Sequence, residues 1–214
     1  MPYHRLRCLL LGLSYMLVRL MFRLSYAGLE HIPEKGPAIL IANNTSMIDM
    51  FVIHARVGPW IHWVAKKELF RYPWSARLLK KLGCIPVNRG KADTAAVRAI
   101  MGALKQGQII GIFPQATRVL PDQIAQMRPR SGAARFAVRT GVPLLPVAID
   151  GRFRLFAKVR VVFGPPFTLA GPDRQTEEAG HMEMLSLHLM QRVYDLIGQK
   201  NVYGLTAVAR TKQA

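Results

Sequence analysis

Short apolar runs alternate along most of this chain with segments in which apolar residues recur at helical spacing. The continuous runs predict buried strands at residues 38–42, 60–64, 84–87, 108–113, 144–149 and 158–163. The periodic segments predict helices at residues 49–55, 75–82, 93–106, 131–140 and 177–197. Strands that alternate with helices over short connections are typical of an α/β fold, so we expect a mostly parallel sheet flanked by helices.

Residues that begin and end helices support these boundaries. Asp93 and Ser131 stand where two of the helices should start, and both are good N-cap residues. Gly107 and Gly141 fall just past two helix ends, where glycine is a common stop signal. We therefore expect the helices over 93–106 and 131–140 to be sharply bounded.

The N-terminal segment has a different pattern, an unbroken series of leucines at alternating spacings of four and three: Leu6, Leu10, Leu13, Leu17, Leu20 and Leu24. Arg5, Arg19 and Arg23 fall on the opposite side, so residues 3–26 are expected to form one amphipathic helix. The uncharged stretch 8–18 is shorter than the ~20 residues of a membrane span. Arginines follow it directly and no small-residue cleavage site appears, which argues against a signal peptide.

Two roles fit this helix. An apolar stripe with arginines opposite suits a helix lying in the headgroup plane of an anionic membrane. The same period also fits a helix packed on the domain core, and the pattern leaves both roles open. We expect residues 1–27 to form a membrane-interfacial segment and residues 28–214 to form one α/β domain, entered through the breaker-rich loop 31–37.

Charge narrows the choice of partner. The chain has 30 Lys and Arg against 12 Asp and Glu, a formal net charge of +18, which favours an anionic partner. Nucleic acid, anionic lipid and phosphorylated substrates all qualify, but the basic residues are spread along the chain without zinc-finger spacing or a stacking motif. We therefore expect an anionic membrane surface rather than nucleic acid. Two cysteines, Cys8 and Cys84, are too few for a disulfide framework and predict reduced thiols in the cytoplasm.

Polar clusters follow four of the predicted strands, at residues 43–49, 65–68, 88–91 and 113–118. In open α/β sheets ligands bind beyond the carboxyl ends of the strands, so these clusters are expected to meet in one site. Their cations include Lys66, Lys67, Arg89 and Arg118. Arginine binds phosphate bidentately, and the sequence therefore predicts an anion pocket at this edge. The histidines are scattered, so we expect no metal.

The order of these motifs resembles the 1-acylglycerol-3-phosphate acyltransferase family over nearly the whole chain. Residues 43–49 read Asn-Asn-Thr-Ser-Met-Ile-Asp where the family has Asn-His-x-Ser-x-x-Asp, and residues 113–118 read Phe-Pro-Gln-Ala-Thr-Arg where it has Phe-Pro-Glu-Gly-Thr-Arg. Residues 83–90 are similar to its second motif, with Arg89 at the family's arginine. Residues 142–147 match its Val-Pro-x-x-Pro-Val strand.

The resemblance implies a glycerolipid acyltransferase fold and a reaction of phospholipid biosynthesis. A fatty acyl group passes from acyl-CoA or acyl-carrier protein to lysophosphatidic acid (1-acylglycerol 3-phosphate) and gives phosphatidic acid, with no cofactor beyond the acyl donor. The motif-one histidine, at the position of Asn44, takes the proton from the attacking hydroxyl, and the residue at Asp49 orients it. The residues implied to bind the substrate phosphate are Arg89, Gln115, Ala116, Thr117 and Arg118, with Lys66 and Lys67 as further candidates. The resemblance also implies monotopic association with the cytoplasmic face of a membrane.

Three residues depart from the family pattern: Asn44, Gln115 and Ala116. An amide cannot usefully accept a proton, and losing a general base typically costs ~10²–10⁴-fold in rate. Gln115 keeps the shape of glutamate without its charge, and Ala116 is disfavoured if its φ must be positive. We therefore expect an impaired acyltransferase, with a catalytically silent lipid-binding homologue at the membrane surface as the alternative.

Other side chains in the sequence do not replace the missing base. His54 comes five residues after Asp49, off the helical face that would bring the two together. His62 lies within a predicted strand between two tryptophans. Ser46 lacks the Gly-x-Ser-x-Gly context of a serine nucleophile, and Cys84 is expected to be a packed thiol.

Overall fold

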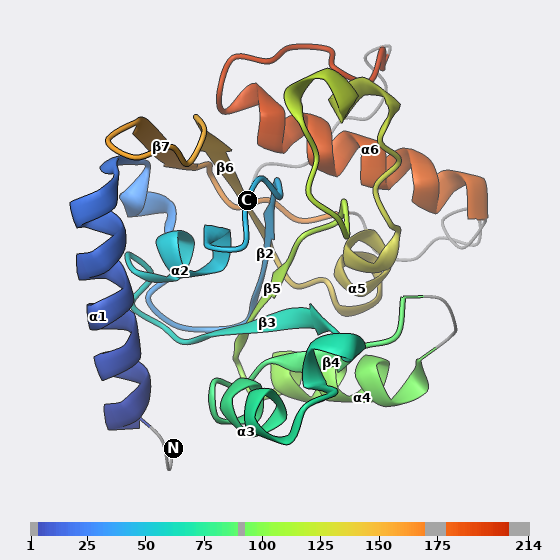
Figure 1. The fold of residues 1–214 in the computed structure, drawn as a ribbon. Coiled ribbons are helices and arrows are strands. Elements are labelled where there is room, and N and C mark those ends of the chain that lie inside the picture. The colour runs from blue at the N-terminus through green and yellow to red at the C-terminus, as the bar shows by residue number, and fades with distance from the viewer. Residues whose placement is uncertain (1–3, 90–92, 170–178, 206–214) are drawn as a thin grey trace.

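One sheet organises the molecule. The computed structural model describes residues 4–89, 93–169 and 179–205, and its seven-stranded sheet has the order β1-β7-β6-β2-β5-β3-β4 (Figure 1). The strands are β1 (Arg23–Ala27), β2 (Ala38–Ala42), β3 (Ile61–Lys66), β4 (Ile85–Val87), β5 (Ile109–Ile112), β6 (Leu144–Asp150) and β7 (Lys158–Phe163). Only the β6–β7 pair in this sheet is antiparallel, so the predicted mostly parallel α/β fold is confirmed.

Helices cover both faces of the sheet (Figure 1). They are α1 (His4–Met21), α2 (Asp49–His54), α3 (Pro73–Lys81), α4 (Thr94–Lys105), α5 (Gly132–Thr140) and α6 (Ala179–Asp195), with short 3-10 turns η1 (Leu29–His31), η2 (Lys67–Phe70) and η3 (Pro121–Gln126). Every residue of β2 is buried because the strand has packed neighbours on both faces. Ile39 and Ile41 pack with α4, α5 and α6, and Leu40 packs with α1 and α2.

Most of the predicted boundaries agree with the structure to within two residues, and residues 177–178 of the last predicted helix lie outside the described ranges. The side chain of Asp93 accepts the N–H of Ala96 and caps α4 as expected. Gly107 and Gly141 lie just past the ends of α4 and α5 as expected, and their φ values are 72° and 65°. Ser131 stands at the N-cap position of α5 as expected, but its hydroxyl makes no capping hydrogen bond and instead accepts one from Arg135 Nε at 3.1 Å.

The prediction of a single helix over residues 3–26 is wrong at its C-terminal end. The helix ends at Met21, and Arg23–Ala27 is a strand parallel to β7. Leu24 continued the helical spacing from Leu20, but the same residues also alternate, with Leu24 and Tyr26 packed inward and Arg23 exposed. Pairing with β7 supplies the hydrogen bonds that favour the strand.

Helix α1 packs with one face and leaves a second apolar face uncovered. Val18 and Phe22 at its end are buried against the sheet. Five large apolar side chains on α1 are more than half exposed: Leu9, Leu13, Met16, Leu17 and Leu20. Three of these, Leu13, Leu17 and Leu20, belong to the leucine stripe, so that part of the stripe does not pack on the core. None of the described helices is both long enough and apolar enough to cross a bilayer.

Candidate active site

The predicted polar clusters meet at one edge of the sheet. Strands β2, β5, β3 and β4 are parallel neighbours, so their carboxyl ends point the same way. The turn 43–49 follows β2, Lys66 ends β3 and Lys67 comes next, Arg89 follows β4 and the segment 113–118 follows β5. This edge is where open α/β sheets bind ligands, and it is the candidate site.

Asp49 is the fixed point of the turn after β2. Its side chain is fully buried at the start of α2, and Oδ2 accepts the N–H groups of Thr45 at 2.5 Å and Ser46 at 2.8 Å. The hydroxyl of Thr45 donates to Oδ1 at 3.0 Å. Burial raises the pKa of Asp49 from 3.8 to about 6, although these hydrogen bonds and the nearby charge of Arg118 act in the opposite direction. The turn is therefore closed on a buried carboxyl group that holds its proton more tightly than an exposed one would.

Gln115 braces this turn against the rest of the domain. Its side chain is 3% exposed, its Oε1 accepts the N–H of Asn44 at 2.8 Å, and its Nε2 donates to the hydroxyl of Tyr194 at 2.8 Å. The carbonyl of Asn44 in turn accepts the N–H of Val119. Both ends of the Gln115 amide are thus used inside the protein. The structure brings Gln115 to the site as an internal brace rather than as a group turned toward a ligand.

The neighbouring Asn43 fixes the turn from the other side. Its amide oxygen accepts the N–H of Ile149 at 2.8 Å, and its amide nitrogen donates to the carbonyl of Ile149 at 2.9 Å. Asn44 therefore stands between two anchored residues, Asn43 and the Asp49-bound Thr45, and its side chain is half-buried. A histidine at residue 44 would be held by the same backbone contacts.

Ala116 has the strained backbone that its family position implies. Its φ is 58°, a left-handed conformation that glycine adopts freely and alanine does not. Its carbonyl accepts a hydrogen bond from Arg89 Nη1, and Arg130 Nη1 donates to the Arg89 carbonyl at 3.1 Å. The segment 113–118 and Arg89 are therefore tied together, as the motifs predicted for one site.

The remaining predicted residues lie at the surface of the same edge. Thr117 and Arg118 are exposed, and Arg118 is close enough to Asp49 to affect its pKa. Lys66 and Lys67 are also exposed. Lys66 Nζ lies 3.3 Å from a carboxylate oxygen of Glu68, and Lys67 helps to lower the pKa of Asp93. These lysines belong to the rim of the site rather than to the turn around Asp49.

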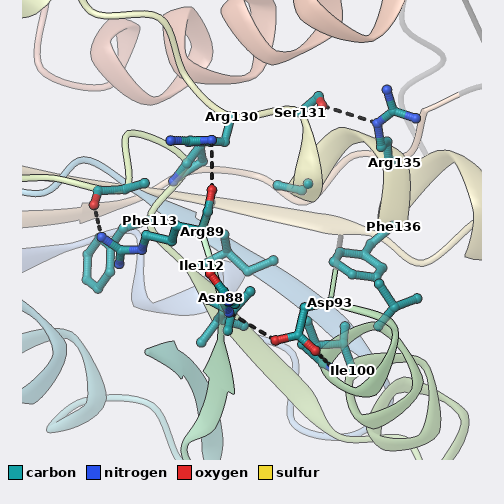
Figure 2. A pocket seen from close by; sticks show the side chains of 18 of the residues that line it. Asn88, Arg89, Asp93, Ile100, Ile112, Phe113, Arg130, Ser131, Arg135 and Phe136 are labelled. Atoms are coloured by element: carbon teal, nitrogen blue, oxygen red, sulfur yellow. Dashed lines mark hydrogen bonds between the residues drawn. The ribbon is translucent and has the colours of Figure 1, made fainter. Parts of the chain in front are cut away.

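A cavity of about 530 Å³ opens beside Arg89 and Ala116 (Figure 2). Its apolar lining comes from α4, α5 and the strand ends, and includes Val87, Ile100, Ile112, Phe113 and Phe136. Four arginines also line it, namely Arg89, Arg130, Arg135 and Arg139, and within the described ranges none of them forms a salt bridge. Asp93 accepts the N–H groups of Asn88 and Ala96 and so joins Arg89's strand end to α4. An apolar interior with a cationic lining suits a ligand that is part hydrocarbon and part phosphate.

Three arginines of this cavity, Arg130, Arg135 and Arg139, lie outside the family motifs and were not predicted from the sequence. Arg135 and Arg139 are four residues apart on α5, on the same side of the helix, and Phe136 lies beside Arg135. That spacing was visible in the sequence. Nothing in the sequence indicated that α5 lies next to the end of β4 in the folded chain.

His54 and His62 lie at the other end of β3 from the site. His54 Nε2 accepts the N–H of Ile61 at 3.3 Å, and burial lowers the pKa of His54 to about 3. His62 Nδ1 lies 2.9 Å from the carbonyl of Gly83, and burial lowers its pKa as well. Because both rings are packed at the amino end of the strand, neither occupies the place of a base beside Asp49.

Comparison with known proteins points to one family. The sequence profile of a family described as Acyltransferase matches residues 23–150, a stretch that contains all four motifs. The chain is 30% identical over 143 residues to a 1-acyl-sn-glycerol-3-phosphate acyltransferase of Bacillus subtilis, covering 64% of this chain and 70% of that protein. It is 32% identical over 135 residues to a protein of the same name from Borreliella burgdorferi, covering 61% of this chain and 52% of that protein.

A solved structure has the same fold. The 1-acyl-sn-glycerophosphate acyltransferase PlsC of Thermotoga maritima matches with a TM-score of 0.62 and 24% identity, over 91% of this chain and 82% of that one. The chain spans about half the length of the Borreliella relative and more than two thirds of the Bacillus one.

Proposed function

The chain belongs to the acyltransferase family, and on that premise we propose that it acts in phospholipid biosynthesis. The proposed reaction transfers a fatty acyl group from acyl-CoA or acyl-carrier protein to lysophosphatidic acid and gives phosphatidic acid. One observation carries the proposal. The buried Asp49 and the turn that it closes stand at the carboxyl edge of the sheet, where Arg118 is close enough to affect the Asp49 carboxyl and Arg89 contacts the segment 113–118.

The chemistry needs a base where Asn44 stands. The substrate hydroxyl attacks the thioester carbonyl, its proton must be removed, and the donor leaves as a thiol. Asp49 would orient an imidazole at residue 44, but the amide of Asn44 accepts no proton near neutral pH. We propose that this copy keeps the substrate site and has lost about 10²–10⁴-fold in rate with the base.

We assign the substrate phosphate to the cations around Ala116. Arg89 uses one guanidinium N–H on the carbonyl of Ala116 and has further donors for an oxyanion. Thr117 and Arg118 are exposed on the same segment, and Lys66 and Lys67 add positive charge at the rim. Gln115 is left to hold Asn44 in place, because its amide is engaged with Tyr194.

We assign the acyl donor to the cavity between α4 and α5. A fatty acyl chain would pack against Ile100, Ile112 and Phe136, and the phosphate of a pantetheine arm would meet Arg135 and Arg139. Coenzyme A and a carrier protein both present that phosphate, so this arrangement accommodates either donor.

We propose that α1 seats the enzyme on the cytoplasmic face of an anionic membrane as a monotopic protein. Its outer face presents Leu13, Leu17 and Leu20 to solvent, and the adjacent Arg19 is exposed as well. The interfacial segment proposed for residues 1–27 then consists of α1, because β1 belongs to the sheet. Residues 28–214 supply the rest of the catalytic domain.

Acyl transfer to lysophosphatidic acid tests the proposal. We expect low turnover by the chain as it is, higher turnover with Asn44→His, and a further rise when Gln115→Glu and Ala116→Gly are added. Met47→His is the matched control. Residue 47 is exposed in the same turn, so this variant adds an imidazole away from the position of the base. If the repaired chain stays silent while vesicle binding persists, the alternative of a silent lipid-binding homologue replaces the proposal.

A further inference from the structure

We propose that residues 151–157, the turn between β6 and β7, form a second membrane-inserting element that joins α1 in binding an anionic lipid bilayer. This inference extends the membrane location proposed above. Leu155 and Phe156 at the tip of the turn are 62% and 64% exposed. Two adjacent large apolar side chains held in water at a turn are costly unless they are covered in the working state of the protein.

The backbone of the turn is strained in a way that presents Phe156. Phe156 has a φ of 61°, a left-handed conformation that is rare for an aromatic residue. Gly151 begins the turn with a φ of 109°, and a side chain there would meet the carbonyl oxygen of Lys158. The conformation is held by hydrogen bonds from Phe156 N to Met21 O at 2.7 Å and from Ala157 N to Arg154 O at 2.9 Å. Strain of this kind persists where neighbouring contacts fix it, and it points to a functional role for the residue.

These contacts join the turn to the C-terminal end of α1. Phe156 donates directly to the last residue of the helix, and Arg23 N donates to Ala157 O at 2.9 Å. The rings of Phe22 and Phe153 meet edge to face at 5.2 Å beneath them. Figure 1 shows the turn beside this end of α1. Leu155 and Phe156 therefore stand next to the exposed face that carries Leu17 and Leu20.

The basic residues around the turn favour an anionic lipid bilayer as its binding partner. Arg152, Arg154, Lys158 and Arg160 are all exposed, and Asp150 is the one acidic residue in the stretch 150–160. Arg19 and Arg23 are exposed at the adjoining end of α1. Apolar side chains ringed by basic ones are the pattern of interfacial binding to anionic lipid, where hydrocarbon enters the acyl boundary and the cations meet headgroups.

The turn lies at the same edge of the sheet as the candidate active site. Strand β6 is parallel to β2, so the turn leaves the sheet at the same edge as residues 43–49. The amide of Asn43 holds Ile149, only two residues before the turn begins. A bilayer in contact with Phe156 would therefore adjoin the edge at which a lipid substrate has to arrive.

Sedimentation with vesicles tests the inference on the full chain. We compare the protein with Leu155→Ser/Phe156→Ser, and with Leu120→Ser as a control, since Leu120 is 60% exposed in a different segment. On vesicles of phosphatidylcholine and phosphatidylglycerol the double variant should lose about tenfold or more in partition coefficient, and the control should not. Added salt should weaken binding of the unmodified protein. Circular dichroism and the thermal transition show whether the double variant is folded.

A fluorescent label at residue 156 reports insertion of the turn and leaves the neighbouring side chains unchanged. An environment-sensitive fluorophore is placed at Phe156→Cys, or at Leu120→Cys as control, in a Cys8→Ser background in which the remaining Cys84 is buried. We expect a blue shift on anionic vesicles at residue 156 and none at residue 120. An unshifted label at 156 on vesicle-bound protein would overturn the inference.

Two further outcomes also count against the inference. If vesicle binding survives in the double variant, α1 docks alone. If the double variant instead separates a dimer in solution, the turn binds a second copy of the chain. Vesicle binding requires no turnover, so failure of the repaired enzyme to transfer acyl groups would count against the proposed function and leave this inference standing.

Discussion

Burial raises the pKa of Asp49, and this shift determines how the stability of the protein changes with pH. The pKa of Asp49 is raised from 3.8 to about 6, chiefly by desolvation, so the folded protein binds this proton more tightly than the unfolded chain does. The resulting stabilisation is present in full below pH 3.8 and is lost as the pH rises through 6.

We therefore expect Asp49→Asn to remove a pH dependence. The free energy of unfolding of the protein, minus that of Asp49→Asn, should fall by on the order of 2–3 kcal/mol between pH 4 and pH 6 and then stay level. Denaturant titrations at several pH values measure this difference, with Asp150→Asn as the exposed control. A difference that is constant across that range would show that the buried carboxyl ionises as it does in the unfolded chain.

Ala116 offers a test of backbone strain at a single residue. Its φ of 58° costs an L-residue about 1–2 kcal/mol, and glycine avoids that cost. Ala116→Gly should therefore raise the free energy of unfolding by about 1 kcal/mol, whereas most alanine-to-glycine changes lower it. Ala99→Gly, at an exposed position within α4, should destabilise by a similar amount. Thermal unfolding of the two variants would contradict the assignment if both shifted in the same direction.

Helix α1 depends on a buried arginine near its start. Arg7 is 9% exposed, its Nε donates to the carbonyl of Lys81 at 2.8 Å, and its guanidinium lies 4.7 Å from the centre of the Trp60 ring. A hydrogen bond and a cation–π contact at one buried side chain attach the helix to α3 and to the residue just before β3.

Replacing that arginine should loosen the whole element. Arg7→Ala is expected to cost about 2–3 kcal/mol of unfolding free energy, while Arg19→Ala, at an exposed position of the same helix, should change it by less than about 0.5 kcal/mol. Hydrogen exchange of α1 amides gives a local readout. Equal protection of α1 in both variants would mean that Arg7 does not anchor the helix.

The two cavity arginines of α5, Arg135 and Arg139, allow a second test at the scale of one element. In the Asn44→His chain, Arg135→Gln/Arg139→Gln should raise the KM for the acyl donor about tenfold or more and leave the KM for lysophosphatidic acid nearly unchanged. Arg98→Gln, on α4 but outside the cavity lining, is the control. Steady-state kinetics with acyl-CoA and with acyl-carrier protein identify the donor, and an unchanged donor KM would remove Arg135 and Arg139 from the site.

The sequence pattern predicted some elements more accurately than others. Strand β2 was predicted at its true boundaries because Ala38–Ala42 is apolar throughout and has the Asn43 turn directly after it. The end of α1 was missed because Leu24 satisfies both the helical and the strand period, and pairing with β7, far along the chain, decides between them. The arginine-lined cavity escaped because α4, α5 and the end of β4 meet only in the folded chain.

At the scale of the whole molecule, the site and the exposed apolar face of α1 are parts of one arrangement. Helix α2 begins at Asp49, and its Val52 and Ile53 belong to the same core cluster as Val18 of α1. The net charge of +18 favours approach to an anionic surface. The fold thus places the turn around Asn44 close to the helix that we propose lies on the bilayer.

We propose that the absence of a base at residue 44 is the main reason for low turnover at this site. The most direct test measures the initial rate of phosphatidic acid formation by the chain as it is, by Asn44→His, and by Asn44→His/Asp49→Asn. We predict that Asn44→His raises the rate by about 10²–10⁴-fold and that adding Asp49→Asn removes most of the gain. Equal rates for the chain as it is and for Asn44→His would contradict the account.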